Sequence, residues 1–121
     1  MKKILIADDE KSLRMLIAGT LEIGNFDVIE SDNGIEALNL ATTEKPDLII
    51  LDVMMPGLTG YQVCQKIKED EQLRQIQIII LTAKGQQADK NTAIEAKADY
   101  YVAKPFSPAY LLSLVEEILG E

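Results

Sequence analysis

The feature that most constrains the fold is a pair of short segments made entirely of large apolar residues, LIIL at 48–51 and IIIL at 78–81. Neither alternates with polar residues, so each segment, if extended, must be covered on both faces. Strands covered on both faces are typical of parallel sheets that carry helices on each side. Apolar runs at 4–7, 26–29 and 100–103 extend the pattern to five strands.

Amphipathic segments lie between the expected strands. The first predicts a helix that Gly24 can end, and the last opens at Ser107-Pro108, a capping serine followed by proline at the first helical position. A weakly apolar helix is expected over 86–96. The residues that mark the other four helices are Leu13, Leu16, Ile17, Thr20 and Leu21; Ala37, Leu38 and Ala41; Val63, Cys64 and Ile67; and Leu111, Leu112, Val115 and Leu119.

The order of the elements predicts an α/β fold of five βα units, (βα)5. Its connections are too long for hairpins and suit right-handed crossovers between parallel strands. A chain of 121 residues has the usual length of one domain, so we expect one domain over 1–121. The expected architecture is a doubly wound five-stranded parallel sheet with the flavodoxin-like strand order 2-1-3-4-5.

Composition excludes several classes of function. A net charge of −8 has the wrong sign for binding nucleic-acid phosphates, and the absence of histidine removes Ser-His-Asp and Cys-His nucleophiles. The one cysteine, Cys64, fits a reducing compartment. No apolar run is long enough to cross a membrane, and the first residues lack the length and cleavage site of a signal peptide. We therefore expect a cytoplasmic protein that binds neither nucleic acid nor membrane directly.

Polar side chains follow four of the five expected strands. The first strand ends in Asp8-Asp9, the third in Asp52, the fourth in Thr82 and the fifth in Lys104. Ligands of open α/β sheets bind outside the carboxyl ends of the strands. These side chains therefore form the candidate site.

The expected strand order makes the first and third strands neighbours, which brings Asp8, Asp9 and Asp52 together. Three carboxylates so close repel one another unless they share protons or bind a cation. Hard oxygen ligands favour Mg²⁺, which usually takes one or two protein carboxylates and leaves positions open for phosphate oxygens. The cluster therefore suggests phosphoryl transfer.

Taken singly, each residue has an ordinary explanation. Asp8-Asp9 could cap the first helix, Asp52 could be a turn residue, Thr82 could end a strand, and Lys104 could be a solvated lysine. Independent residues have no reason to gather at one sheet edge, however. Together they predict an aspartyl-phosphate site.

At these residues the sequence resembles the receiver domain of bacterial two-component response regulators, over essentially the whole chain. The motifs that carry the resemblance are Ile6-Ala7-Asp8-Asp9-Glu10, the stretch from Pro46 to Pro56 (PDLIILDVMMP) with Gly60, Leu81-Thr82-Ala83, and Lys104-Pro105-Phe106.

The resemblance implies that Asp52 attacks a phosphohistidine on a sensor histidine kinase or phosphotransfer protein. Asp9, Asp52 and the main-chain oxygen of Met54 would hold Mg²⁺, with Asp8 acting through water. Lys104 would offset the charge of the phosphoryl group. The chain would then be a phosphoacceptor switch that catalyses only its own phosphorylation and dephosphorylation.

The resemblance also implies a switch in which Thr82 donates its hydroxyl to the phosphate and the aromatic ring of Tyr101 swings inward. The output would be a changed surface on the fourth helix, fifth strand and fifth helix, for a downstream effector protein or self-dimerisation. Lys104-Pro105 resembles the family's cis peptide.

Four positions set this chain apart within the family. Lys97 stands where many members have glycine and would pay about 1 kcal/mol for a left-handed conformation. Tyr100 replaces a common acid, which argues against the charged dimer contact of DNA-binding relatives. Met54 and Lys84 occupy positions that tune loss of phosphate; neither can act as a base at neutral pH, so we expect slow reset.

Two other classes of function lack residues that they need in this sequence. A phosphatase of the haloacid-dehalogenase kind needs a second acid two residues after the nucleophile, where this chain has Met54. A flavodoxin-like flavin carrier needs a phosphate-cradling loop where this chain has Asp8-Asp9. The end of the chain at Gly120-Glu121 fits either a stand-alone receiver or a piece of a longer regulator.

Overall fold

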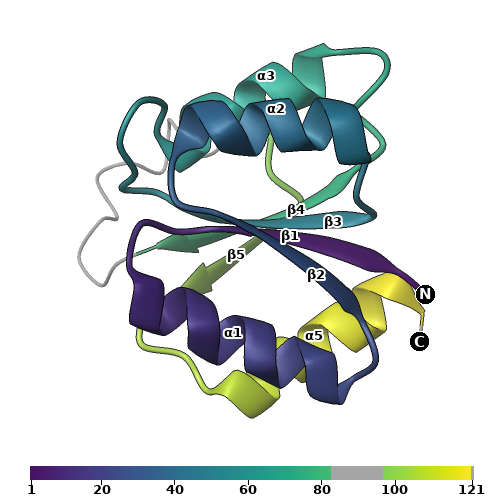
Figure 1. Ribbon diagram of the computed structural model, residues 1–121. Helices are drawn as coiled ribbons and strands as arrows, with labels where there is room; N and C mark the ends of the chain where they lie inside the picture. The colour runs from purple at the N-terminus through teal and green to yellow at the C-terminus, as the bar shows by residue number, and fades with distance from the viewer. Residues whose placement is uncertain (83–96, 121) are drawn as a thin grey trace.

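The computed structural model describes residues 1–82 and 97–120, in which five strands alternate with helices (Figure 1). The helix expected over 86–96 lies outside the described residues. None of the described helices has the length and apolar character needed to cross a membrane. The elements are β1 (Lys3–Ala7), α1 (Lys11–Ile23), β2 (Asp27–Ser31), α2 (Gly34–Glu44), β3 (Leu48–Asp52), α3 (Gly60–Glu69), β4 (Gln77–Thr82), β5 (Tyr100–Ala103) and α5 (Pro108–Leu119).

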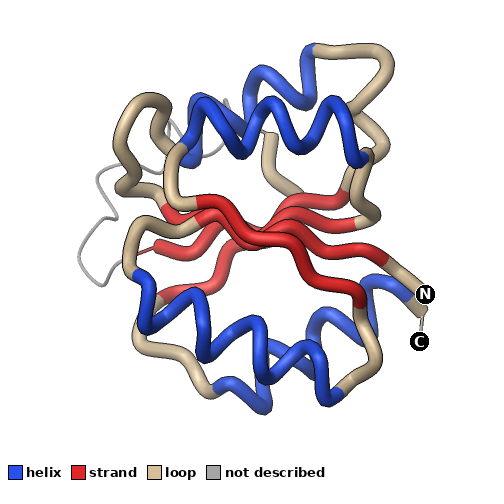
Figure 2. Tube along the Cα trace, in the orientation of Figure 1, coloured by secondary structure: helices blue, strands red, loops and turns tan. Residues whose placement is uncertain are grey.

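All five strands are parallel and follow the order β2-β1-β3-β4-β5, as the sequence predicts. Figure 1 shows α1 and α5 on one face of the sheet and α2 and α3 on the other. Figure 2 shows the strands as the middle layer between these helices. The sheet is therefore doubly wound, and the carboxyl ends of its strands share one edge.

The continuous apolar runs are explained by two cores. On β3, Ile49 and Leu51 pack into the core beneath α2 and α3, while Leu48 and Ile50 pack into the core beneath α1 and α5. All four side chains are fully buried. Burying a side chain of this size stabilises the fold by about 1.5–3 kcal/mol. No position on this strand faces water, which is why none is polar before Asp52.

One residue of the predicted apolar face of α1 is exposed rather than buried. The buried residues of this helix are Ile17, Ala18 and Leu21, whereas Leu16 is 50% exposed. Leu16 lies on the flank of the helix, where an i, i+3 spacing alone does not distinguish buried from exposed positions. The expectation that it belongs to the core is therefore wrong.

Gly24 ends α1 as expected, but not through a left-handed backbone. Its φ is −83°, and the left-handed residue is Asn25, with a φ of 65°. A Cβ on Gly24 would lie 2.9 Å from Cδ1 of Leu112, so the glycine permits close packing against α5. The Phe26 N–H donates to the Leu21 carbonyl at 3.4 Å, which leaves Phe26 in the turn rather than in the strand predicted for 26–29.

The predicted start of α5 and two backbone features are confirmed. The Ser107 hydroxyl accepts a hydrogen bond from the Tyr110 N–H, with Pro108 opening the helix. Lys97 has a φ of 63°, the left-handed conformation considered for it from the sequence, and the Lys104-Pro105 peptide is cis.

Candidate functional site

The three acids expected at the carboxyl edge of the sheet meet there. One carboxylate oxygen from each of Asp8, Asp9 and Asp52 lies within 4.8 Å of the others. Asp8 and Asp52 are buried, while Asp9 is exposed. The site is thus closed on the side of Asp8 and Asp52 and open on the side of Asp9. The acids lie together because β1 and β3 pair in register up to Ala7 and Leu51, and both strands continue into acids.

All polar atoms of Asp8 except one side-chain oxygen form hydrogen bonds with the described residues. Its N–H donates to the Ser31 carbonyl at 3.0 Å, and its Oδ1 accepts from the Glu10 N–H at 2.8 Å. Its Oδ2 is buried and accepts no hydrogen bond from the described residues. A buried oxygen without a partner costs free energy, so this atom is available for a ligand.

The environment of Asp8 opposes its ionisation. Burial raises the pKa of its carboxyl group, and the charge of Asp52 adds to the increase, while the Glu10 N–H and Lys104 act in the opposite direction. A helix cap does not explain this residue, because the N-cap of α1 is Glu10 and its side chain makes no capping bond. The arrangement suits a bound cation better than a bare pair of acids.

Lys104 reaches into the acid cluster from the end of β5. Its Nζ lies 2.6 Å from Oδ1 of Asp52 and 3.8 Å from Oδ2 of Asp8. The Lys104 side chain is 26% exposed and is not a solvated surface lysine. A cation so placed partly offsets the two buried carboxylates and leaves a positive group where a phosphate oxygen could bind.

Thr82 and Tyr101 lie on neighbouring strands near this edge. Thr82 is the last residue of β4, and its carbonyl accepts from the Lys104 N–H at 2.6 Å. Tyr101 pairs in register with Ile80, and it is 43% exposed. The main chain of Thr82 is thus hydrogen-bonded to that of Lys104, while Tyr101 lies on β5, the outermost strand on that side of the sheet, and outside the acid cluster.

Of the two positions expected to affect the rate of phosphate loss, the structure describes only one. Met54 lies in the loop that follows β3, two residues after Asp52, and its side chain is 62% exposed. Lys84 lies outside the described residues. Their effect on reset stays a prediction.

Cys64 is not part of the site. It is buried on α3, and burial raises the pKa of its thiol to about 12. A thiol with that pKa stays protonated at neutral pH and is a poor nucleophile and metal ligand.

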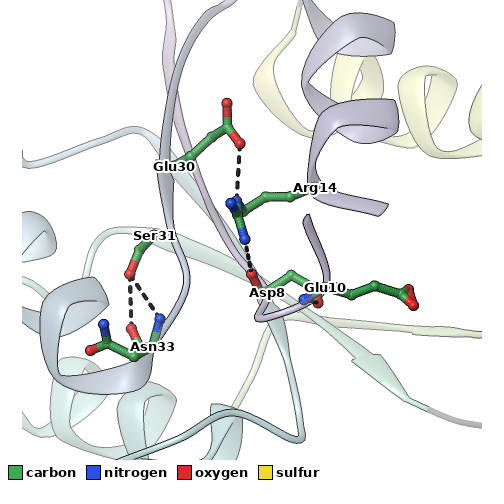
Figure 3. A network of polar contacts seen from close by, with 6 residues as sticks. All are labelled: Asp8, Glu10, Arg14, Glu30, Ser31 and Asn33. Carbon is green, nitrogen blue, oxygen red and sulfur yellow. Dashed lines mark hydrogen bonds and ion pairs between the residues drawn. The ribbon is translucent and has the colours of Figure 1, made fainter. Parts of the chain in front are cut away.

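Sequence reasoning missed a polar network behind Asp8 (Figure 3). The Arg14 guanidinium donates from Nη1 to the Asp8 carbonyl at 2.7 Å and pairs through Nε with Glu30 at 3.1 Å. The Ser31 hydroxyl donates to the Asn33 carbonyl and accepts from the Asn33 N–H. The Arg14 contacts join α1 and β2 to the loop that carries the acids, while the Ser31 contacts hold the turn between β2 and α2. No local sequence pattern indicates the Arg14 contacts, because they depend on the pairing of β2 with β1.

Removing the charge of Asp8 is expected to stabilise the metal-free protein. In Asp8→Asn the buried carboxylate, whose Oδ2 accepts no hydrogen bond from the described residues, becomes a neutral amide of the same shape, and its repulsion from Asp52 disappears. We expect the free energy of unfolding to rise by about 1–2 kcal/mol. Urea denaturation with EDTA present measures it. Asp9→Asn, at an exposed position, should have a smaller effect, and a less stable Asp8→Asn variant would contradict the account.

The fold and the site together define a doubly wound α/β domain with a cluster of three acids and a lysine at the carboxyl edge. Residues 4–116 match the family described as the response regulator receiver domain. The chain belongs to this family, the receiver domains of two-component signal transduction.

Similar proteins of known identity are transcriptional regulators. The chain is 46% identical over 118 residues to the alkaline phosphatase synthesis transcriptional regulatory protein PhoP of Bacillus subtilis, covering 98% of this chain and 48% of that protein. It is 42% identical over 118 residues to the phosphate regulon transcriptional regulatory protein PhoB of Pseudomonas aeruginosa, covering 98% and 52%. The chain therefore spans about half the length of these relatives.

Solved receiver domains have the same fold. The receiver domain of the sensor histidine kinase PA1611 from Pseudomonas aeruginosa, with a magnesium ion coordinated in its active site cleft, matches with a TM-score of 0.90 and 30% identity over 99% of this chain and 98% of that one. The BeF3-activated DrrB receiver domain matches with a TM-score of 0.88 and 33% identity over 100% and 99%.

Proposed function

We propose that this chain is a Mg²⁺-dependent phosphoacceptor switch in which Asp52 receives a phosphoryl group from a phosphohistidine on a sensor histidine kinase or phosphotransfer protein. The observation that carries the proposal is the cluster of Asp8, Asp9 and Asp52, in which Asp8 and Asp52 are buried, one oxygen of Asp8 accepts no hydrogen bond from the described residues, and Lys104 contacts Asp52. The Mg²⁺ coordinated in the cleft of the PA1611 receiver domain supports it.

The residues present fit a magnesium ion. Three hard carboxylate oxygens lie within 4.8 Å of one another, and one buried oxygen of Asp8 accepts no hydrogen bond from the part of the chain that the structure describes. Asp9, Asp52 and the main-chain oxygen of Met54 would hold the ion, with Asp8 acting through water. When bound, Mg²⁺ would supply positive charge that offsets the phosphoryl oxygens.

The chain's own residues account for the rest of the transfer. An oxygen of Asp52 forms a bond to phosphorus as the bond between phosphorus and the histidine nitrogen breaks, and the departing imidazole takes up a proton. Lys104, already 2.6 Å from Asp52, can follow the developing charge onto a phosphate oxygen. The burial of Asp8 and Asp52 keeps the inner side of the site away from bulk water.

Phosphorylation should require the metal. With a small-molecule phosphodonor and Mg²⁺ the protein should gain one phosphoryl mass, and EDTA should slow this labelling at least about tenfold, since three acids without a cation repel the incoming phosphate. Intact-mass spectrometry over time measures the rate, and excess Mg²⁺ added after EDTA should restore it. Equal rates with and without metal would refute the metal site.

We further propose that Thr82 and Tyr101 carry the signal rather than the chemistry. The Thr82 hydroxyl would bind a phosphate oxygen and Tyr101, now 43% exposed, would turn inward. The changed surface would comprise the fourth helix, β5 and α5, for a downstream effector protein or a second copy of the chain. The fourth helix expected over 86–96 lies outside the described residues.

Thr82→Ala should separate phosphorylation from switching. We expect labelling of Asp52 to remain within about threefold of wild type, because the acids and Lys104 are unchanged, whereas the response of β5 and α5 is lost. Backbone NMR shifts of Tyr101 and Val102 before and after phosphorylation measure that response. Tyr101→Phe, which keeps the ring, is the control. Wild-type shifts in phosphorylated Thr82→Ala would show that the relay runs elsewhere.

In this proposal residues 1–121 form one receiver domain that acts in the cytoplasm and catalyses only its own phosphorylation and dephosphorylation. Because Met54 is exposed beside the site and cannot orient a water molecule, and Lys84 cannot act as a base at neutral pH, phosphate loss should be slow. The output of any longer protein that contains this chain would follow from its other domains.

A further inference from the structure

The main-chain carbonyl of Asp8 is held by a side chain rather than by the sheet. β1 ends at Ala7, so the next carbonyl has left the regular ladder. The Arg14 Nη1 donates to it at 2.7 Å, from the second turn of α1. This is a short, charge-assisted hydrogen bond, of the kind that contributes more than a neutral one.

Glu30 fixes the orientation of that guanidinium group. Its carboxylate lies 3.1 Å from Nε of Arg14, on the opposite side of the planar fork from the contact with Asp8 (Figure 3). The side chain of Arg14 is only 15% exposed. Since the guanidinium is rigid and planar, anchoring Nε fixes where Nη1 points.

The contact controls both acids of the pair. The Asp8 carbonyl belongs to the planar peptide that joins Asp8 to Asp9, so fixing its oxygen restricts the rotation of that plane. On the other side of Asp8, the N–H donates to the Ser31 carbonyl at 3.0 Å. The backbone of Asp8 is therefore held at both ends, and this sets the directions in which the two carboxylates leave the chain.

The geometry points to Arg14, oriented by Glu30, as a positioning residue that holds the Asp8-Asp9 peptide in the conformation that binds Mg²⁺. This inference rests on the proposed function, because it assigns the acids to the metal. Arg14 itself contacts neither carboxylate of the pair in the bonds described, and its charge is paired with Glu30. It acts through the backbone. Partners behind metal ligands commonly contribute about 10-fold to 100-fold in metal affinity.

A simpler explanation is that the ion pair between Arg14 and Glu30 only stabilises the packing of α1 against β2. The two explanations differ for Arg14→Lys. An ammonium group can still pair with Glu30 and preserve most of that stabilisation, but it lacks the rigid fork that reaches the acid and the carbonyl at once. A purely structural role therefore predicts normal Mg²⁺ binding in this variant, and a positioning role predicts weak binding.

The test is calorimetric titration of MgCl2 into wild type, Arg14→Lys and Arg14→Ala, each shown to be folded at the working temperature by circular dichroism. We expect the Kd for Mg²⁺ to rise about tenfold in both variants, with the Tm of Arg14→Lys within a few degrees of wild type. Arg14→Lys carries the test if the alanine variant does not fold.

The matched control is Lys3→Ala, which removes another ion pair to a glutamate, between Lys3 and Glu44 at 2.9 Å, at the far end of β1. It should bind Mg²⁺ with the wild-type Kd. If Arg14→Lys also binds within twofold of wild type, the positioning role is wrong while the proposed function stands. If wild type itself binds no Mg²⁺, the proposed metal site fails and this inference fails with it.

Discussion

Asp52→Asn is expected to abolish phosphorylation by a small-molecule phosphodonor in the presence of Mg²⁺. The amide keeps the shape of the side chain but has no anionic oxygen to attack phosphorus, and it loses the ion pair with Lys104. Because the nucleophile is removed rather than misplaced, the fall in labelling rate should be about 100-fold or more. Intact-mass spectrometry at matched times measures it.

The control for this prediction lies at the other end of the same strand. Asp47 precedes β3, and its Oδ2 accepts from the Lys3 N–H, so Asp47→Asn changes an aspartate far from the carboxyl edge. It should be labelled at the wild-type rate. A phosphoryl mass gain that persists in Asp52→Asn would assign the acceptor to another residue.

Gly60→Ala should unfold or severely destabilise the protein. A Cβ at this position would overlap the Asp52 carbonyl oxygen, and that oxygen is a main-chain atom that cannot turn away. The Gly60 N–H also donates to the Val53 carbonyl at 3.0 Å, so any shift that relieves the clash breaks this bond. We expect a loss of about 3 kcal/mol or more in the free energy of unfolding.

Gly19→Ala is the matched control for that effect. Gly19 lies on α1, and no atom of the described residues lies within 4 Å of a Cβ built there, so the same substitution meets no obstacle among them. Since alanine has the higher helix propensity, we expect a gain of about 0.5–1 kcal/mol. Urea denaturation of both variants gives the comparison. A stable Gly60→Ala variant would show that the loop between β3 and α3 can move away from the site.

The sheet could be predicted from the sequence because its central strand is covered on both faces. Leu48, Ile49, Ile50 and Leu51 alternate between two cores and are all fully buried, which leaves an unbroken apolar run as the signal. Positions on the flank of a helix carry no such signal. Leu16 has helical spacing and yet is half exposed.

The acids of the site could be predicted once the sheet was known to be parallel, since parallel strands place their carboxyl ends at one edge. Arg14 could not. Its partners are a main-chain carbonyl, which every residue has, and Glu30, which is sixteen positions away and reaches it only through the pairing of β2 with β1.

The same limit applies to Gly34. A Cβ there would clash with the Leu58 carbonyl oxygen, in a contact between the start of α2 and a loop that is distant in the sequence. Nothing in the local pattern around Gly34 indicates that approach. Close contacts between main-chain atoms become visible only once both segments are placed.

The most direct test of the central claim is to locate the phosphoryl group on the chain. Reduction of an acyl phosphate with borohydride converts the phosphorylated aspartate into homoserine, which survives proteolysis and can be placed by tandem mass spectrometry. After treatment with the phosphodonor and Mg²⁺, the account predicts homoserine at position 52 alone. Homoserine at position 8 or 9, or an unmodified position 52 in protein that has gained the phosphoryl mass, would contradict it.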